Sequence, residues 1–112
     1  MNYFFYPIST DKQGESAMRK IILFGTGTWG GCPPVKEVLS ENNIKYMYVD
    51  ICEGVGKLKS FLKVRDTAPE MQEVREQHRA GIPCLVVDDQ VILVNGAEHM
   101  QQLIEQYQLK ED

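Results

Sequence analysis

Two spacings of apolar residues follow one another along the chain, and they predict alternating strands and helices. The continuous apolar run at 21–24 fits a strand that is buried on both faces at the centre of a sheet. After a glycine-rich segment at 25–31, apolar residues recur at helical spacing from 35 to 39. A second apolar run at 46–49 completes a strand–helix–strand unit, in which the two strands are expected to be parallel.

The middle of the chain predicts two further helices. Apolar residues at 58–62 recur at helical spacing, and a second stripe of this kind occupies 71–78. Thr67 and Glu70 have the spacing of a capping box, so we expect the third helix to begin near them. Gly81 is expected to end that helix.

The last third predicts a hairpin and a helix. The apolar runs 84–87 and 91–94 flank a short polar turn, as the two strands of a β-hairpin do. Asn95 is expected to cap a final helix with an apolar stripe over 100–107. The predicted fold is therefore α/β, ordered βαβ–αα–ββα, with a four-stranded mixed sheet flanked by helices.

The first residues differ from the rest of the chain. The aromatic run Tyr3-Phe4-Phe5-Tyr6 precedes a polar, non-periodic stretch at 9–16. We interpret residues 1–17 as an N-terminal arm or linker and residues 18–112 as one domain. The arm could pack Phe4 and Phe5 onto its own domain, or onto a neighbouring copy in a homo-oligomer; the alternative is a tail with no fixed partner.

Composition narrows the class of protein. The chain has 112 residues, of which 43% are hydrophobic and 25% charged, as in a soluble single domain. No apolar stretch approaches the roughly 20 residues of a membrane span, and no basic segment precedes the aromatic run as in a signal peptide. We therefore expect a cytoplasmic protein that does not bind membranes. The net charge of -4 argues against nucleic-acid binding.

The cysteines also exclude some classes. Three cysteines do not make the disulfide framework of a secreted domain. The spacing of Cys32, Cys52 and Cys84 does not match a zinc ribbon, and the chain has only two histidines, so no metal site is expected.

Two segments carry candidate chemistry. In Trp29-Gly30-Gly31-Cys32-Pro33-Pro34, Cys32 begins the first helix, where backbone amides and the helix dipole lower the pKa of a thiol that they reach. Ile82-Pro83 enters the third strand, at a place where a cis peptide bond is a deliberate feature. Together the two segments indicate thiol–disulfide chemistry.

These features resemble glutaredoxin-like proteins, which have the thioredoxin fold. The resemblance rests on Phe24-Gly25 before the loop, on Lys36 four residues after Cys32, and on Ile82-Pro83. The chain is most similar to a group of small bacterial glutaredoxin-related proteins, whose long middle segment resembles residues 58–67. The resemblance covers about residues 19–94.

The family motif is altered in this chain. In glutaredoxins, three loop residues separate Phe-Gly from the C-x-x-C motif. The first cysteine of the motif attacks the disulfide, and the second resolves the mixed disulfide that forms. Counting from Phe24-Gly25 without gaps puts Trp29 at the first position and Cys32 at the second, which makes the motif W-x-x-C. A rival alignment inserts three residues and makes Cys32 the nucleophile of a monothiol C-P-P-V site.

The resemblance implies a thiol–disulfide oxidoreductase in which Cys32 is the catalytic thiol and activity is weak or lost. Trp29, Ile82 and Pro83 would form the substrate site, where the Ile82 backbone pairs with an extended peptide or with glutathione. Cys84 is either a second thiol within disulfide distance of Cys32 or a small buried core residue.

The implied partners are glutathione, as a co-substrate, and protein thiols or disulfides, with no bound cofactor. The loop lysine that pairs with glutathione in the family is replaced by Thr26, and the family's Gly-Gly turn by Asn95-Gly96. The alternative function is a redox-inactive binding module that uses the groove of Trp29 and Ile82-Pro83.

Overall fold

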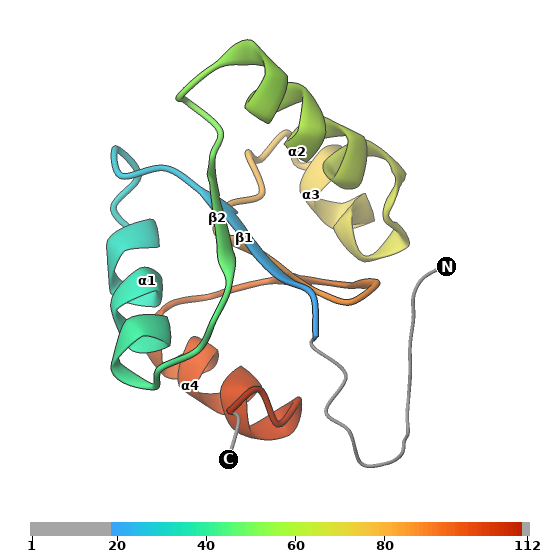
Figure 1. Ribbon diagram of the computed structural model, residues 1–112. Coiled ribbons are helices and arrows are strands. Elements are labelled where there is room, and N and C mark those ends of the chain that lie inside the picture. Colours follow the sequence, from blue (N-terminus) through green and yellow to red (C-terminus); the bar gives the residue numbers. More distant parts are fainter. Residues whose placement is uncertain (1–18, 111–112) are drawn as a thin grey trace.

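A computed structural model describes residues 19–110, which form a four-stranded sheet between two pairs of helices (Figure 1). The elements are β1 Ile21–Gly25, α1 Cys32–Glu41, β2 Met47–Asp50, α2 Val55–Thr67, the 3-10 turn η1 Pro69–Met71, α3 Gln72–Glu76, β3 Cys84–Val87, β4 Gln90–Leu93 and α4 Ala97–Gln106. The predicted α/β class and element order are confirmed. The expected arm at 1–17 lies outside the described residues.

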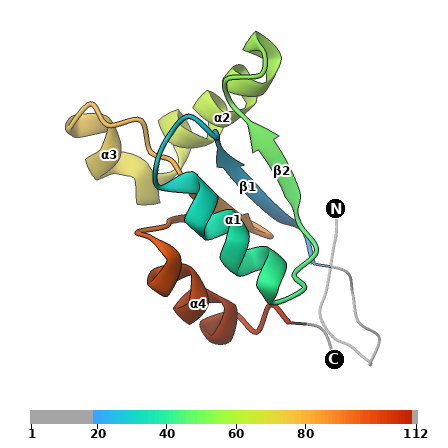
Figure 2. The same cartoon turned by 90° about the vertical axis from the view of Figure 1, so that its left-hand side faces the viewer.

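The sheet is mixed, as predicted. Its strand order is β2-β1-β3-β4, with β1 parallel to β2 and antiparallel to β3, and with β3 antiparallel to β4. Helices α1 and α4 lie on one side of the sheet, and α2 and α3 lie on the other (Figures 1 and 2). The carboxyl ends of β1 and β2 therefore share one edge of the sheet.

Alternating side chains along the strands build a core on each face. The face under α1 and α4 buries Ile21, Leu23, Leu85 and Val87 against helix residues that include Val35, Leu39, Met100, Leu103 and Ile104. The opposite face buries Phe24 and Cys84 against Phe61, Met71 and Val74. The Phe24 and Phe61 rings are tilted, with centroids 5.3 Å apart.

The middle helices differ from the prediction. Thr67 is the last residue of α2, and its Oγ1 donates a hydrogen bond to the Lys63 carbonyl, so it does not cap the next helix. Ala68 precedes Pro69 and is extended (ψ 128°), because proline disfavours helical backbone in the residue before it. A 3-10 turn follows before α3 begins.

The third helix is also shorter than expected. α3 ends at Glu76, and His78 has a left-handed backbone (φ 58°), so the stripe that was expected to extend to residue 78 stops at Val74. Gly81 has φ 91°, and a Cβ there would lie 2.8 Å from the Met71 methyl carbon, so Gly81 is a packed loop glycine beyond the helix.

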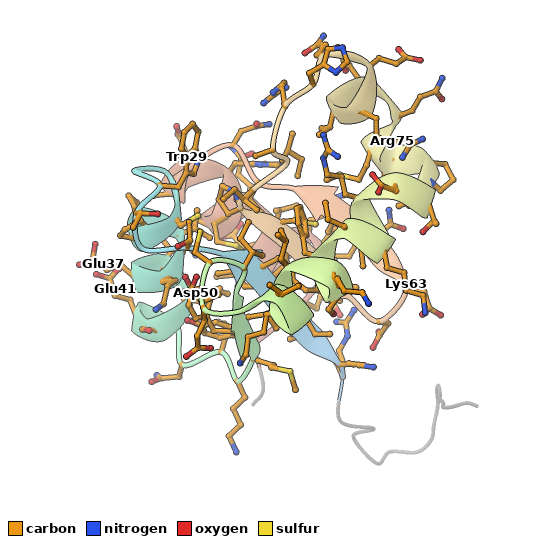
Figure 3. All side chains as sticks on the ribbon, turned by 90° about the horizontal axis from the view of Figure 1, so that it is seen from above. Trp29, Glu37, Glu41, Asp50, Lys63 and Arg75 are labelled. Atoms are coloured by element: carbon orange, nitrogen blue, oxygen red, sulfur yellow. The ribbon has the colours of Figure 1, made fainter. Side chains whose placement is uncertain are left out.

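Arg75 ties α3 to the end of α2. Its Nη1 donates to the carbonyls of Arg65 and Ala68, at 2.7 and 2.9 Å (Figure 3 labels Arg75). A cation placed on the last carbonyls of a helix satisfies acceptors that have no partner within that helix. Among residues 19–110, no helix combines the length and the apolar character that a membrane crossing requires.

We predict that Phe61→Ala lowers the free energy of unfolding by about 3–5 kcal/mol, because it leaves a cavity against Phe24 in the second core. Leu58→Ala in the same helix is the control. Leu58 is 36% exposed, so its truncation is expected to cost about 1 kcal/mol or less. Urea unfolding of the two variants measures the difference. Equal losses would contradict the packing of α2 described above.

Candidate functional site

The loop between β1 and α1 positions the altered motif. The parallel strands end together, with Gly25 opposite Asp50, and the Ile51 N–H donates to the Gly25 carbonyl at 2.9 Å. Two successive turns follow, because the Trp29 N–H donates to the Thr26 carbonyl and the Cys32 N–H donates to the Trp29 carbonyl. The loop therefore holds Trp29 at its outer end and brings Cys32 back to the sheet.

Cys32 is the first residue of α1, and its side chain is fully buried. Its Sγ accepts a hydrogen bond from the Thr26 N–H at 3.5 Å. A Cβ added to Gly25 would lie 2.8 Å from that sulfur, closer than real Cβ atoms approach a neighbour. The glycine at the end of β1 therefore makes room for the thiol.

Burial decides the acidity of this thiol. Loss of solvent around Cys32 raises its pKa above the ordinary range, and the nearby Asp50 carboxylate raises it further. The Thr26 hydrogen bond and the Lys36 ammonium group lower it, but they do not outweigh burial. The expected lowering of the Cys32 pKa is therefore not found. The amide that reaches the sulfur comes from the loop residue Thr26.

Tyr48 and Lys36 close the site on the β2 side. The Lys36 Nζ lies 3.9 Å from the centroid of the Tyr48 ring, in a cation–π contact. The hydroxyl of Tyr48 is buried and has no hydrogen-bond partner within residues 19–110. Burial, together with Asp50, raises the pKa of Tyr48, so the ring stays neutral beside the thiol.

Trp29 and Pro83 meet around Gly31. The Trp29 side chain is 54% exposed, and Figure 3 shows it projecting from the loop before α1. A Cβ on Gly31 would lie 3.4 Å from the indole Nε1 and 3.8 Å from the Pro83 Cδ. The Ile82-Pro83 bond is cis, which confirms the prediction. Three of the expected site residues, Trp29, Ile82 and Pro83, are therefore assembled at one place.

The backbone beside the proline is available for pairing. No residue between 19 and 110 bonds to the N–H or the carbonyl of Ile82, although the Ile82 side chain packs against the second core. The Pro83 carbonyl, in contrast, accepts the Val94 N–H at 3.0 Å. A free donor and a free acceptor next to an exposed aromatic ring can pair with an extended chain.

The start of α4 differs from the expected cap. Gly96 is the N-cap residue, with φ 114°, and Asn95 lies one position earlier. The Asn95 N–H donates to the His99 Nδ1 at 2.9 Å, so the imidazole of the first turn reaches back to satisfy it. Thr26, where the glutaredoxin resemblance implies a lysine, is buried, and its hydroxyl hydrogen-bonds to that of Thr28. Residue 26 therefore supplies no cation for a carboxylate.

Cys84 and Cys32 are not brought together. Cys84 is paired in register with Phe24 and faces the α2 side, whereas Cys32 packs on Gly25, one position further along β1 and hence on the other face. Both thiols are free and buried. Burial, with a smaller effect of Glu70, raises the pKa of Cys84 to about 12. Cys84 is placed as a core residue.

Cys52 is the exposed one of the three cysteines, and it was not among the expected site residues. It follows β2 in a turn where its N–H donates to the Asp50 Oδ1 at 2.9 Å. Because β1 and β2 are parallel, this turn lies at the same sheet edge as the loop that carries Trp29. The signal in the sequence was its position directly after a strand predicted to be parallel to the first.

Comparisons with known proteins do not assign a family. No family model matches the chain, and no curated protein matches it. Within the described part of the chain, no group of three or more His, Cys, Asp or Glu residues is placed to hold a metal ion. The chemistry of the site must therefore be inferred from its own geometry.

The three thiols are predicted to react in a fixed order. At about pH 8 an alkylating reagent should modify Cys52 first, because it is exposed. Cys32 should react slowly until the pH is well above the ordinary thiol pKa of about 8.5, since its raised pKa keeps it protonated. Cys84 should react only on unfolding or near its pKa of about 12.

Mass spectrometry of digests, taken over time at graded pH, measures the three rates. Cys52→Ser should abolish the fast phase and leave the other two rates unchanged. Rapid alkylation of Cys32 that persists below pH 8 would contradict the burial described here.

Proposed function

We propose that this chain is a glutaredoxin-like protein of the thioredoxin fold whose altered W-x-x-C site binds extended peptides and has little or no disulfide turnover. One observation carries the proposal: the exposed Trp29 indole and the cis Pro83 flank Gly31, while the motif thiol Cys32 is buried. Binding of a peptide would use Trp29 and the backbone beside Pro83. Catalysis would need an accessible Cys32 thiol, which the structure does not provide.

The sheet supports the assignment of fold. A parallel β1–β2 pair, an antiparallel β3–β4 hairpin and a cis proline at the start of β3 agree with what the glutaredoxin resemblance implies. The helix that follows β1 begins at Cys32, as the family's motif helix would. The combination is more specific than any one of these features.

In the proposed binding mode, the main chain of Ile82 forms hydrogen bonds with the ligand, and the Trp29 ring packs against the ligand's side chains. An extended ligand would accept from the Ile82 N–H and donate to the Ile82 carbonyl, neither of which has a partner within residues 19–110. Its side chains would contact the indole, because a tryptophan buries a large area at low cost in conformational entropy. Gly31 lies between the indole and the buried Pro83 ring, where a side chain would contact both.

The class of ligand is inferred from residue 26, where the resemblance implies a lysine and this chain has a threonine. Glutathione has a glycine carboxylate, and the loop residue that would pair with it is the buried Thr26. Glu98 is the acidic residue in the first turn of α4, so it opposes a second anion there. We therefore expect protein segments carrying thiols or disulfides to bind in preference to free glutathione, and no bound cofactor is needed.

Thiol–disulfide exchange is the second candidate, because the Thr26 N–H and Lys36 both favour a thiolate at Cys32. Cys32 would lose its proton to solvent and attack one sulfur of a disulfide. The other sulfur would leave as a thiolate. A second thiol, from glutathione or a protein, would then release the mixed disulfide and regenerate Cys32. This route requires the loop to open, since Cys32 is buried.

The binding proposal predicts a large effect from one loop glycine. Gly31→Val should weaken binding of an extended cysteine-containing peptide by about tenfold or more, because its side chain fills the space between Trp29 and Pro83. Gly27→Val is the matched control, since a Cβ at Gly27 has nothing within 4 Å. Fluorescence of Trp29, the chain's one tryptophan, reports binding. Equal affinities of the two variants would refute the proposed groove.

The binding proposal also predicts that disulfide exchange at Cys32 is absent. With a small glutathione mixed disulfide as substrate, the protein and Cys32→Ser should show the same background rate, because the buried thiol does not reach the substrate. Cys52→Ser controls for reaction at the exposed thiol. A rate that exceeds background and disappears only in Cys32→Ser would establish exchange in place of binding alone.

A further inference from the structure

The two faces of the sheet are covered to different extents. Under α1 and α4, the first and third residues of β1 are buried: Ile21 and Leu23 are 7% and 0% exposed, and their β3 neighbours Val87 and Leu85 are 2% and 0% exposed. On the α2 side, the buried strand residues are Phe24 and Cys84, which lie opposite each other on β1 and β3. The row at the start of β1 is different.

That row crosses all four strands and is entirely apolar. Ile22 of β1 is opposite Met47 of β2 and Val86 of β3, and Val86 is opposite Val91 of β4. We call these four residues the open row. Met47 is 60% exposed, and the other three are only partly buried. A continuous apolar band of this kind differs from the isolated exposed side chains that are normal on a surface.

The helices of the described part of the chain cover the open row only in part, because Ile22, Val86 and Val91 pack at the margin of the second core while Met47 is left exposed. The fully buried residue of α2 is Phe61, and its ring lies on Phe24 in the next row. Val74 of α3 packs in that same cluster. Within residues 19–110, the α2 side of the sheet therefore has one covered row and one partly covered row.

The preceding segment enters the domain beside the open row. The Lys20 N–H donates to the Asp88 Oδ1 at 3.1 Å, and the Asp88 N–H donates to the Lys20 carbonyl at 2.7 Å. Arg19 forms an ion pair with the same carboxylate. These bonds fix the chain at the turn between β3 and β4, directly before Ile21 and Ile22.

We propose that the aromatic run Tyr3-Phe4-Phe5-Tyr6 of the same chain docks on the open row. The polar stretch 9–16 joins the run to this entry point. At about 3.3 Å per extended residue, that stretch is long enough to turn back across four strands spaced about 4.8 Å apart. This inference does not depend on the proposed function.

The chemistry of the two surfaces matches. The run offers four aromatic rings, and the open row offers three branched side chains and a methionine, whose sulfur contacts aromatic rings favourably. Neither surface carries a charged side chain. A short tether also raises the effective concentration of the run at its own domain to the millimolar range, which favours the same chain over a second copy.

A disulfide-trapping experiment tests the docking in the full-length protein. In a Cys52→Ser background, Phe4→Cys is combined with Met47→Cys or, as control, with Asp89→Cys. Asp89 is exposed in the β3–β4 turn where the segment enters, so an undocked segment would reach it at least as readily. Under mild oxidation we expect the Met47 pair to close about tenfold faster, within a monomer.

A non-reducing gel separates monomeric from dimeric disulfides, and mass spectrometry identifies the linked cysteines. A monomeric disulfide that favours Met47→Cys supports docking within the chain. A covalent dimer through the same pair would overturn it in favour of a second copy. Equal or slower closure with Met47→Cys than with Asp89→Cys would overturn docking altogether.

Unfolding in urea gives an independent reading. Phe4→Ser with Phe5→Ser, and Met47→Ser separately, should each lower the unfolding midpoint, and combining them should lower it no further than the larger single effect. Val55→Ser is the control, because Val55 is 73% exposed on α2 outside the open row, and its effect should add. Additive effects of the arm and Met47 substitutions would contradict the proposal.

Discussion

The contact between Gly25 and the Cys32 sulfur is the constraint on which the site depends. It joins the last residue of the central strand to the first residue of α1, with the Thr26 N–H donating to the same sulfur. The loop between these two points has to fold outward because both of its ends are fixed. Trp29 is therefore exposed, and both it and Pro83 lie beside Gly31. A larger residue at position 25 would separate strand and helix, and with them the indole and the proline.

The same contact separates binding from reactivity. A thiol that anchors a helix must be buried, and burial raises its pKa, so its structural use works against its use as a nucleophile. In a C-x-x-C motif these duties fall on two cysteines. Under the proposed W-x-x-C alignment, Trp29 stands at the position of the first cysteine, and an indole cannot attack a disulfide. The remaining accessible thiol, Cys52, belongs to the neighbouring turn and has no loop amide on its sulfur among the described bonds.

Periodicity predicted most of the fold because each strand and the longer helices bury one regular set of side chains. The cis bond at Ile82-Pro83 was expected from the family resemblance, whereas its position before a strand showed only that a cis bond can occur there. The failures have local causes. Thr67 hydrogen-bonds backward to Lys63, and Pro69 ends the helix that precedes it. The spacing of Thr67 and Glu70 alone does not distinguish this arrangement from a capping box.

The raised pKa of Cys32 could not be read from its place at a helix start, because burial depends on how the loop folds back. The open row required strand register, which periodicity alone does not give.

The two surfaces lie toward opposite ends of β1. Gly25, beneath the site, and Ile22, in the open row, are three residues apart, which is about 10 Å along a strand. Between them lie Leu23 and Phe24, both buried in closely packed cores. An arm on the open row would therefore not cover Trp29 or Pro83, and it could influence ligand binding only by stabilising the sheet as a whole. A stable sheet matters to the site, because the exposed indole and the free Ile82 backbone contribute little to holding their own loops in place. If the proposed docking and the proposed binding both hold, the arm would stabilise the sheet without occupying the space beside Trp29.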